Sequence, residues 1–321
     1  MMGASSANTT SLPSWARGLE AKLQRDFVLA PLTTLKVGGP ADWYYPADSV
    51  DDLVRVLTQV NQADVPVTLL GDGSNVLISD LGIRGVVIHN RAKEISRVGD
   101  NLYSESGALL SALVERSRLE SLTGLEFAAG IYGSVGGAVY GNAGAYGKSM
   151  EDILLWVEVL TADGRREKVG PDQMGFTYRK SRCRENRWVV LSCMVGLQPA
   201  EQQAITNEIN RIIGVRATKL PSDLPSAGSY FKNIEDPRAE HGKVPAGKLL
   251  EAVGAKSMRV GGAAVYEKHA NVIVNSGGAT AADILELADR MRRAVRDRFG
   301  IELHSEVRFL GEHQPGAEVE S

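Results

Sequence analysis

The composition of this chain is that of a folded protein with more than one domain. It has 321 residues, too many for one typical domain of about 100–200 residues, and 43% of them are hydrophobic while 23% are charged. The 36 Lys and Arg residues nearly balance the 39 Asp and Glu residues, so the net charge is -3. No block of like charge stands out, and we therefore expect a small-molecule ligand rather than a nucleic acid or a membrane surface.

The start of the chain and its two cysteines predict where the protein works. Residues through Ser11 are small and polar, without a basic or apolar leader segment, and no stretch reaches transmembrane length. Cys183 and Cys193 lack a short metal-ligand spacing. We expect a cytoplasmic protein with idle thiols, no metal site and a flexible tail over residues 1–20.

Predicted secondary structure falls into three blocks. In the first block, Ser49 caps a helix that runs to about Ala63, and strands are predicted at 65–70 and 76–78. The second block has strands at 153–160 and 188–197 and ends with a helix at 201–213. The third block has a helix closed by Gly300 and several segments of strand character. Its elements are predicted at 260–265, 270–274, 280–299, 301–303 and 307–310.

Glycine accounts for 34 residues and is concentrated in two places. Eight glycines fall between Gly124 and Gly147, too many for a helix or a plain strand. Such small residues cannot build a core, so close approach of the backbone to a ligand is the better interpretation of this segment. A second cluster, Gly71–Asn75, follows a predicted strand, and by itself it is more often an ordinary turn.

Neither cluster fits a familiar nucleotide fingerprint. A dinucleotide-binding motif would need glycine at Val76 and a helix after it, and a phosphate loop ending at Lys148 would need glycine at Asn142. What remains is a pair of glycine-rich turns whose backbone N–H groups suit a diphosphate.

A series of motifs along the chain resembles one known family. The strings are TLKVGGPA at 34–41, LGDGSNVL at 70–77, EFAAGIYGSVGGA at 126–138, NAGAYG at 142–147, FTYRKS at 176–181, SAGSYFKN at 226–233, AGKLL at 246–250, EKHAN at 267–271 and EVRF at 306–309. In this order and spacing they resemble the UDP-N-acetylenolpyruvoylglucosamine reductases over about residues 30–310. One departure is Tyr132, where the family usually has proline.

The resemblance implies an α+β fold with a two-part FAD-binding unit of the vanillyl-alcohol oxidase (PCMH) type. Its two parts would span 21–91 and 92–214, an α/β substrate-binding domain would span 215–311, and a tail would follow at 312–321. The short interval between Arg179 and Gly228 is similar to that of the family's compact form, which lacks an extra substrate-covering loop. The implied reaction uses NADPH as co-substrate and noncovalent FAD. It reduces UDP-N-acetyl-3-O-(1-carboxyvinyl)-glucosamine to UDP-N-acetylmuramate in peptidoglycan precursor synthesis.

The resemblance also assigns the site residues. Arg179 would stabilise the enolate, Ser229 would protonate it, and Glu306 would orient the substrate carboxylate. Lys232 is expected to assist Ser229 only because it lies close to it in the sequence. The residues expected to bind FAD are Gly71, Gly73, Ser74, Asn75, Gly130, Gly133, Ser134, Val135, Gly136 and Gly137. Those expected to contact the substrate are Lys219, Tyr230, Lys232 and Asn233.

Two other functions stay open from the sequence. One is an oxidase or dehydrogenase of an alcohol or sugar on the same FAD fold, although no His or Cys that would tether the flavin occurs in 71–77 or 130–147. The other is a flavin-free module that binds nucleotide sugars, which an absorbance spectrum would distinguish.

Overall fold

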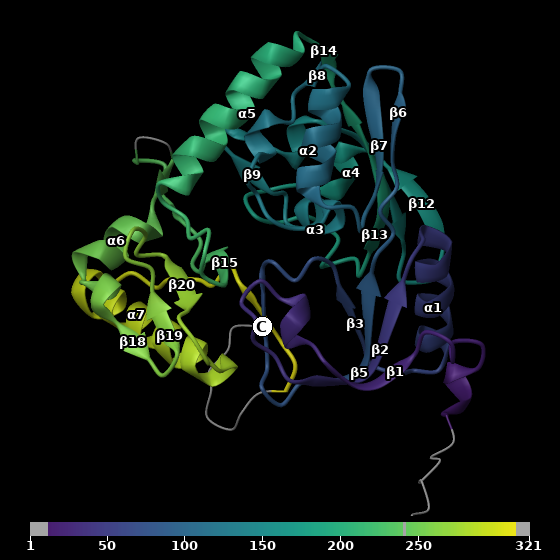
Figure 1. The fold of residues 1–321 in the computed structure, drawn as a ribbon, viewed down its shortest axis with the longest axis horizontal. Helices are drawn as coiled ribbons and strands as arrows, with labels where there is room; N and C mark the ends of the chain where they lie inside the picture. The colour runs from purple at the N-terminus through teal and green to yellow at the C-terminus, as the bar shows by residue number, and fades with distance from the viewer. Residues whose placement is uncertain (1–11, 240–241, 313–321) are drawn as a thin grey trace, which may run out of the picture.

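Three sheets, each formed from a separate stretch of the sequence, organise the chain (Figure 1). The structure is a computed structural model, and it describes residues 12–239 and 242–312. Helices and strands are mixed within every part, so the predicted α+β class is confirmed.

The first sheet has the strand order β1-β2-β5-β3, with β1 antiparallel to β2 and the other pairs parallel. Helix α1 buries Leu53, Val56 and Val60 against this sheet, and the Ser49 side chain accepts the N–H of Asp52, as the sequence predicts. The elements are β1 (Gln24–Val28), η2 (Ala30–Leu32), β2 (Pro40–Ala47), α1 (Val50–Gln62), β3 (Val67–Leu70), β4 (Val76–Ile78) and β5 (Ile83–Asn90). The Gly71–Asn75 turn follows β3 at the carboxyl edge of these parallel strands, where ligands of α/β sheets bind.

The prediction of a flexible tail over 1–20 is wrong for residues 12–20. Helix η1 (Ser14–Ala16) lies there, and Ala16 and Leu19 are fully buried because they pack onto the first unit. Gln59 of α1 also donates to main-chain carbonyls of this segment. The rest of the two predicted tails, residues 1–11 and 313–321, lies outside the described residues. Glu312, the first residue of the predicted C-terminal tail, donates its N–H to the Gly82 carbonyl.

The second sheet is antiparallel, with the order β12-β11-β13-β7-β6. Its elements are β6 (Ile95–Val98), β7 (Asn101–Glu105), α2 (Leu110–Leu119), β8 (Leu122–Thr123), η3 (Glu126–Ala128), α3 (Val135–Tyr140), β9 (Gly144–Ala145), β10 (Lys148–Ser149), η4 (Met150–Asp152), β11 (Leu154–Leu160), β12 (Arg166–Val169), α4 (Pro171–Met174), β13 (Val189–Gly196) and β14 (Gln198–Pro199). Helix α5 (Gln202–Ala217) then leads from this unit to the C-terminal domain (Figure 1), and it runs four residues beyond the predicted end at Ile213.

The third sheet, of order β15-β20-β19-β18, packs against α7. Its elements are β15 (Ser226–Ser229), β16 (Ile234–Glu235), β17 (Lys243–Val244), α6 (Ala246–Ala252), η5 (Ala255–Ser257), β18 (Arg259–Val260), β19 (Ala263–Val265), β20 (Val272–Asn275) and α7 (Ala281–Phe299). Thr280 caps α7, and Gly300 ends it with a left-handed φ of 66°, as predicted. The predicted strand at 301–303 is wrong, because no neighbouring strand pairs with it.

The last strand crosses from the C-terminal domain to the first unit. Strand β21 (Arg308–Leu310) pairs in parallel with β4, and Figure 1 shows this yellow segment near the centre of the molecule. The pairing places Glu306, two residues before β21, beside the Gly71–Asn75 turn that precedes β4.

A carboxylate of the first unit caps the long helix of the C-terminal domain. The two oxygens of Asp80 accept the N–H groups of Ala281 at 2.8 Å and Ala282 at 3.0 Å. A negative charge at this helix end also interacts favourably with the helix dipole. Asp80 therefore links the two parts by an interaction that neither part makes alone.

We expect Asp80→Ala to lower the free energy of unfolding by ~1–2 kcal/mol, because two N–H groups in the first turn of α7 lose their acceptor. Asp80→Asn keeps one acceptor oxygen and should lose less. Urea unfolding followed by circular dichroism measures both variants. Equal midpoints for wild type and Asp80→Ala would show that Thr280 alone caps the helix.

Candidate active site

The two glycine-rich turns lie directly against each other. Ser74 Oγ donates to the Tyr132 carbonyl at 3.2 Å, and a Cβ at Gly71 would come within 2.5 Å of Ser134 Oγ. Gly73 has a φ of 66°, which residues with a side chain rarely adopt. The side chain of Tyr132, at the position of the family's usual proline, is 71% exposed, so it takes up no space inside the turn.

Three backbone N–H groups at the start of α3 are already used within the protein. Those of Val135, Gly136 and Gly137 each donate a hydrogen bond at 2.8–3.2 Å. The acceptors are, in order, the Ala108 carbonyl, the Ser106 carbonyl and the Ser134 hydroxyl. These N–H groups thus have acceptors inside the protein, and their contact with a diphosphate stays a prediction. Glycine at position 136 lets α3 pack closely on Ser106, since a Cβ there would lie 2.8 Å from the Cβ of Ser106.

Arg179 and Glu306, 127 positions apart in sequence, form a partly buried ion pair. Arg179 Nε donates to Glu306 Oε1 at 2.6 Å, and Arg179 Nη2 donates to the Gly144 carbonyl at 3.3 Å. The two side chains are only 26% and 19% exposed. Arg179 also has a left-handed φ of 57°, and such strained conformations in residues other than glycine cluster at functional sites.

The backbone of Glu306 joins this pair to the other predicted site residues. Its N–H donates to the Tyr230 carbonyl at 2.8 Å, which places the preceding residue, Ser229, next to the same segment. Its carbonyl accepts from Asn75 Nδ2 at 3.1 Å, and the Asn75 carbonyl accepts the N–H of Arg308 at 3.1 Å. Glu306 thus contacts Arg179, the residue that follows Ser229 and the end of the first glycine turn.

The position of Ser229 depends on an irregularity in β15. The register with β20 shifts between Ser226 and Ser229, and Gly228 in between has a φ of 74°. A bulge of this kind changes the direction of the side chain that follows it. Gly228 therefore allows the chain to present Ser229 at the end of the strand.

The predicted substrate contact of Tyr230 is wrong for its side chain. Tyr230 is 6% exposed and packs in the core of the C-terminal domain, with its ring 5.1 Å from that of Phe231. Burial raises the pKa of Tyr230 to about 12, although Arg292 and Ser305 act in the opposite direction. Its hydroxyl faces the core, and only its carbonyl serves the site.

The other predicted substrate residues have mixed surroundings. Asn233 Oδ1 accepts the N–H of Ala246 at 3.2 Å, so this side chain holds the start of α6. The N–H of Lys232 donates to the His304 carbonyl, while Lys219 is exposed after the end of α5. Lys219 and Lys232 stay predictions as substrate residues.

Three further residues at the site were not predicted: Tyr178, Lys243 and Arg216. Tyr178 is half-buried, with the Arg179 guanidinium 5.3 Å from its ring centroid and Lys243 Nζ 3.2 Å from it. Arg216 Nε donates to the Gly130 carbonyl at 3.0 Å, and burial lowers the pKa of its guanidinium. Tyr178 had a signal, since it precedes Arg179 in one motif. Arg216 had none, because a basic residue in the last turn of a helix usually complements the helix dipole.

A cavity of about 390 Å³ lies at the opposite end of the first glycine turn from Asn75. It opens at the carboxyl ends of β2, β5 and β3, and Gly71 is among its walls. The walls also include Tyr44, Asp48, Asp72, His89, Arg91 and Leu109. The turn thus has the cavity at one end and the Arg179–Glu306 pair at the other.

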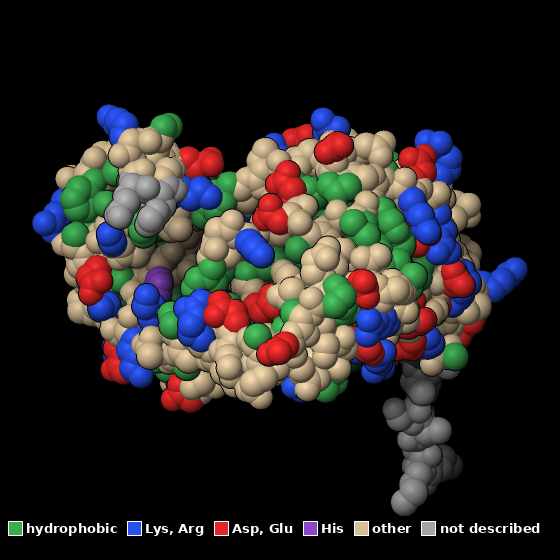
Figure 2. Space-filling view, turned by 90° about the horizontal axis from the view of Figure 1, so that it is seen from above, with side chains coloured by type: hydrophobic (Ala, Val, Ile, Leu, Met, Phe, Trp, Pro, Cys, Tyr) green, Lys and Arg blue, Asp and Glu red, His purple; other side chains and the backbone are tan. Residues whose placement is uncertain are grey.

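Residues 12–239 and 242–312 contain no group of three His, Cys, Asp or Glu side chains placed to hold a metal ion. Cys183 and Cys193 are both buried and unbridged, and burial raises the pKa of Cys193 to about 12. No helix in the described parts of the chain is both long and apolar enough to cross a membrane. Figure 2 shows acidic and basic side chains interspersed over one face, without a continuous basic surface.

Comparison with known proteins identifies the family. The chain is 41% identical over 296 residues to the UDP-N-acetylenolpyruvoylglucosamine reductase of Gloeobacter violaceus, a match that covers 91% of this chain and 98% of that protein. It is 42% identical over 283 residues to the reductase of that name from Heliobacterium modesticaldum, covering 87% and 88%. The chain belongs to the UDP-N-acetylenolpyruvoylglucosamine reductase family.

Two domain families match separate parts of this reductase, and the site residues are distributed over both matches. Residues 41–170 match the FAD binding domain, and residues 220–310 match the C-terminal domain of UDP-N-acetylenolpyruvoylglucosamine reductase. The crystal structure of UDP-N-acetylenolpyruvylglucosamine reductase (MurB) from Thermus caldophilus matches with a TM-score of 0.76 and 32% identity, over 90% of this chain and 99% of that one. Both glycine turns lie in the first match and Ser229 and Glu306 in the second, whereas Arg179 lies between them.

We expect Gly136→Ala to lower the free energy of unfolding by about 1–3 kcal/mol, because the new methyl group overlaps Ser106. Gly137→Ala is the matched control in the same helix, since a Cβ there would lie 3.4 Å from Ser134 Oγ. Urea unfolding of the two flavin-free variants measures the difference. A Gly136→Ala protein that unfolds like wild type but no longer binds flavin would instead assign the glycine to the cofactor.

Proposed function

We propose that this protein reduces the enolpyruvyl ether of UDP-N-acetylglucosamine to the lactyl ether of UDP-N-acetylmuramate. NADPH supplies the electrons through noncovalently bound FAD. The observation that carries the proposal is the convergence of Arg179, Glu306 and the Ser229 segment at the end of a glycine turn. This convergence occurs in a chain that belongs to the reductase family. We place the reaction in the cytoplasm, as a step of peptidoglycan precursor synthesis.

The residues around the first glycine turn fit FAD. The turn lies at the carboxyl edge of a parallel sheet, and the 390 Å³ cavity beside Gly71 is large enough for one nucleoside half of the dinucleotide. The adenosine half would lie in this cavity, and the flavin would lie toward Asn75 and Arg179. FAD held there would supply the hydride chemistry that links NADPH to the double bond of the substrate.

Arg179 binds the carboxylate of the enolpyruvyl group in this proposal. Hydride addition leaves negative charge on the carbon beside that carboxylate, and a fixed guanidinium stabilises the charge as it develops. Glu306 takes the Nε–H of Arg179 and the Gly144 carbonyl takes one N–H of Nη2, so the plane of the guanidinium is fixed and Nη1 is left for the substrate. The backbone bonds of Glu306 make this orientation rigid.

Ser229 donates the proton that completes the reduction. A serine hydroxyl is a weak acid near neutral pH, so it needs positive charge or a proton-relaying partner close by. Arg179 supplies charge on one side of the site, and Lys232, three residues after Ser229, is the proposed partner. Neither the proton donor nor the carboxylate contact is required when NADPH reduces the flavin.

We expect Ser229→Ala to leave flavin reduction by NADPH near normal. Flavin reoxidation by the enolpyruvyl nucleotide should slow by about 10²–10⁴-fold, the usual effect of losing a general acid. Anaerobic stopped-flow absorbance measures the two half-reactions separately. Ser226→Ala, in the same strand, is the control and should change neither.

Reoxidation of Ser229→Ala within a few-fold of wild type would remove this serine from the mechanism. With the wild-type enzyme in deuterated water, solvent deuterium should appear at the carbon that Ser229 protonates. A protein that binds no flavin, or that fails to consume the enolpyruvyl nucleotide, would contradict the proposed function as a whole.

A further inference from the structure

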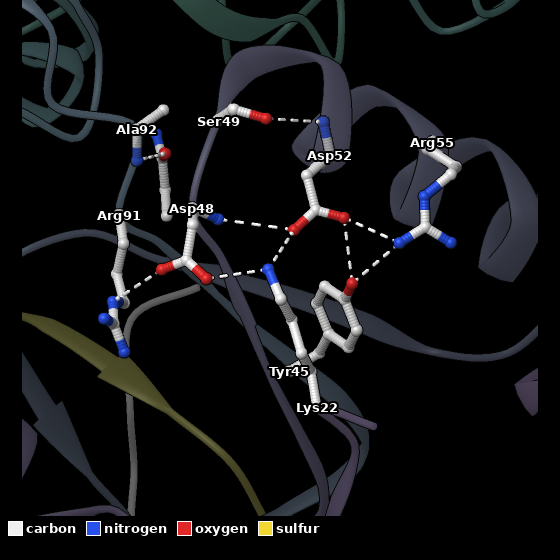
Figure 3. A network of polar contacts seen from close by, with 9 residues as sticks. Lys22, Tyr45, Asp48, Ser49, Asp52, Arg55, Arg91 and Ala92 are labelled. Atoms are coloured by element: carbon white, nitrogen blue, oxygen red, sulfur yellow. Dashed lines mark hydrogen bonds and ion pairs between the residues drawn. The ribbon is translucent and has the colours of Figure 1, made fainter. Parts of the chain in front are cut away.

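An ionic network connects the N-terminal segment to the wall of the 390 Å³ cavity (Figure 3). Asp48 Oδ2 accepts from Lys22 Nζ at 2.7 Å, and Asp48 Oδ1 accepts from Arg91 Nε at 3.0 Å. Asp48 and Arg91 both line the cavity, whereas Lys22 lies before the first strand. Lys22 thus reaches the cavity wall through a single carboxylate.

Asp52 holds Lys22 from its other side. Its Oδ2 accepts from Lys22 Nζ at 2.8 Å, and its Oδ1 accepts from the Tyr45 hydroxyl at 2.8 Å and Arg55 Nη2 at 2.7 Å. Burial opposes the ionisation of Asp52, but the hydrogen bonds from Lys22, Arg55 and Tyr45 outweigh it and lower its pKa to about 2. Lys22 is therefore fixed between two carboxylates, and Asp48 is fixed with it.

Arg91 is the cation that this network holds at the cavity. Its N–H donates to the Ala47 carbonyl at 2.7 Å, its Nε is taken by Asp48, and its guanidinium also hydrogen-bonds the Tyr44 side chain at the cavity wall. The side chain is 52% exposed although both ends of the residue are anchored. Next to it, the Tyr44 hydroxyl lies 2.8 Å from His89 Nδ1, and burial raises the pKa of Tyr44 against the opposing effect of Arg91.

The remaining walls suit a flat, partly apolar group. Leu109 is a cavity wall and is 45% exposed, so it offers an apolar surface there. Asp72 lines the cavity too, and burial raises the pKa of its carboxyl group although Lys36 acts against this. Asn90 and Lys93 are further polar walls of the cavity. An apolar surface beside a planar cation suits a purine nucleoside.

We propose that Arg91 binds the adenosine half of FAD and that Asp48 and Lys22 are positioning residues that hold its guanidinium in the cavity. The proposal rests on the proposed FAD-dependent function and adds the origin of a preference for FAD over FMN. A guanidinium donates hydrogen bonds in its plane and stacks on flat rings, so it can recognise adenosine in either way. FMN has the flavin and one phosphate but no adenosine, and Arg91 contributes nothing to its binding.

The test measures which flavin the full-length holoenzyme keeps. The protein is equilibrated with a mixture of FAD and FMN, freed of unbound flavin, and the released flavins are quantified by chromatography. Arg91→Met should lower the bound FAD-to-FMN ratio by about 10–100-fold, the effect expected when hydrogen bonds to a charged group are lost. Asp48→Asn and Lys22→Met should shift the ratio in the same direction by a smaller factor, and Lys22→Arg should restore it.

Arg55→Met is the matched control. Arg55 belongs to the same network and binds Asp52 and Tyr45, but it is not a wall of the cavity, so the ratio should stay within two-fold of wild type. ADP provides a second readout, because the ADP concentration needed for half-maximal binding should be higher for Arg91→Met than for wild type. Arg91→Lys keeps the charge without the planar fork and should give an intermediate ratio, which tests the residue even if Arg91→Met does not fold.

An unchanged ratio in Arg91→Met or Arg91→Lys would overturn the proposal. So would equal weakening of FAD and FMN, because the arginine would then act on a phosphate or on the fold. Failure of the proposed function has a different signature: wild type itself would bind neither flavin.

Discussion

The active site depends on the hydrogen bonds that the backbone of residues 305–308 makes to two domains at once. Within this segment, the Glu306 carbonyl accepts from Asn75 in the glycine turn of the first unit, and the Glu306 N–H donates to the Tyr230 carbonyl after β15. Strand β21 continues the same attachment by pairing with β4. Because these contacts use the backbone of residues 305–308, they leave the Glu306 side chain for the chemistry.

The charge arrangement follows from that attachment. The partly buried guanidinium of Arg179 needs a fixed anion, and Glu306 supplies it from a segment that cannot move without breaking the link between the domains. The same link is reinforced at a distance by Asp80, which caps α7, and by Asn275, whose side chain donates to the Leu35 carbonyl. The contacts that stabilise the domains against each other therefore also set the geometry of the site.

The first glycine turn separates two different binding environments. At its Asn75 end lie the ion pair and the proposed proton donor, where charge changes during the reaction. At its Gly71 end lies a cavity in whose wall Asp48 and Arg91 form an ion pair, as Figure 3 shows. A dinucleotide that spans the turn would thus have its flavin half near Arg179 and Glu306, where charge changes during the reaction. Its adenosine half would lie beside Arg91, whose guanidinium is held by Asp48.

The sequence by itself determined the features that depend on neighbouring residues and on the family. The Ser49 cap, the Gly300 helix end and the turn after β3 follow local rules, and the ordered motifs identify Arg179, Ser229 and Glu306 as one set. Only the tertiary structure decided that the Tyr230 side chain belongs to the core, that N–H groups of α3 are used internally and that Arg216 and Arg91 approach the site. The physical reason is that a side chain's direction and a hydrogen bond's partner depend on how distant sheets pack, and no spacing along the chain encodes that packing.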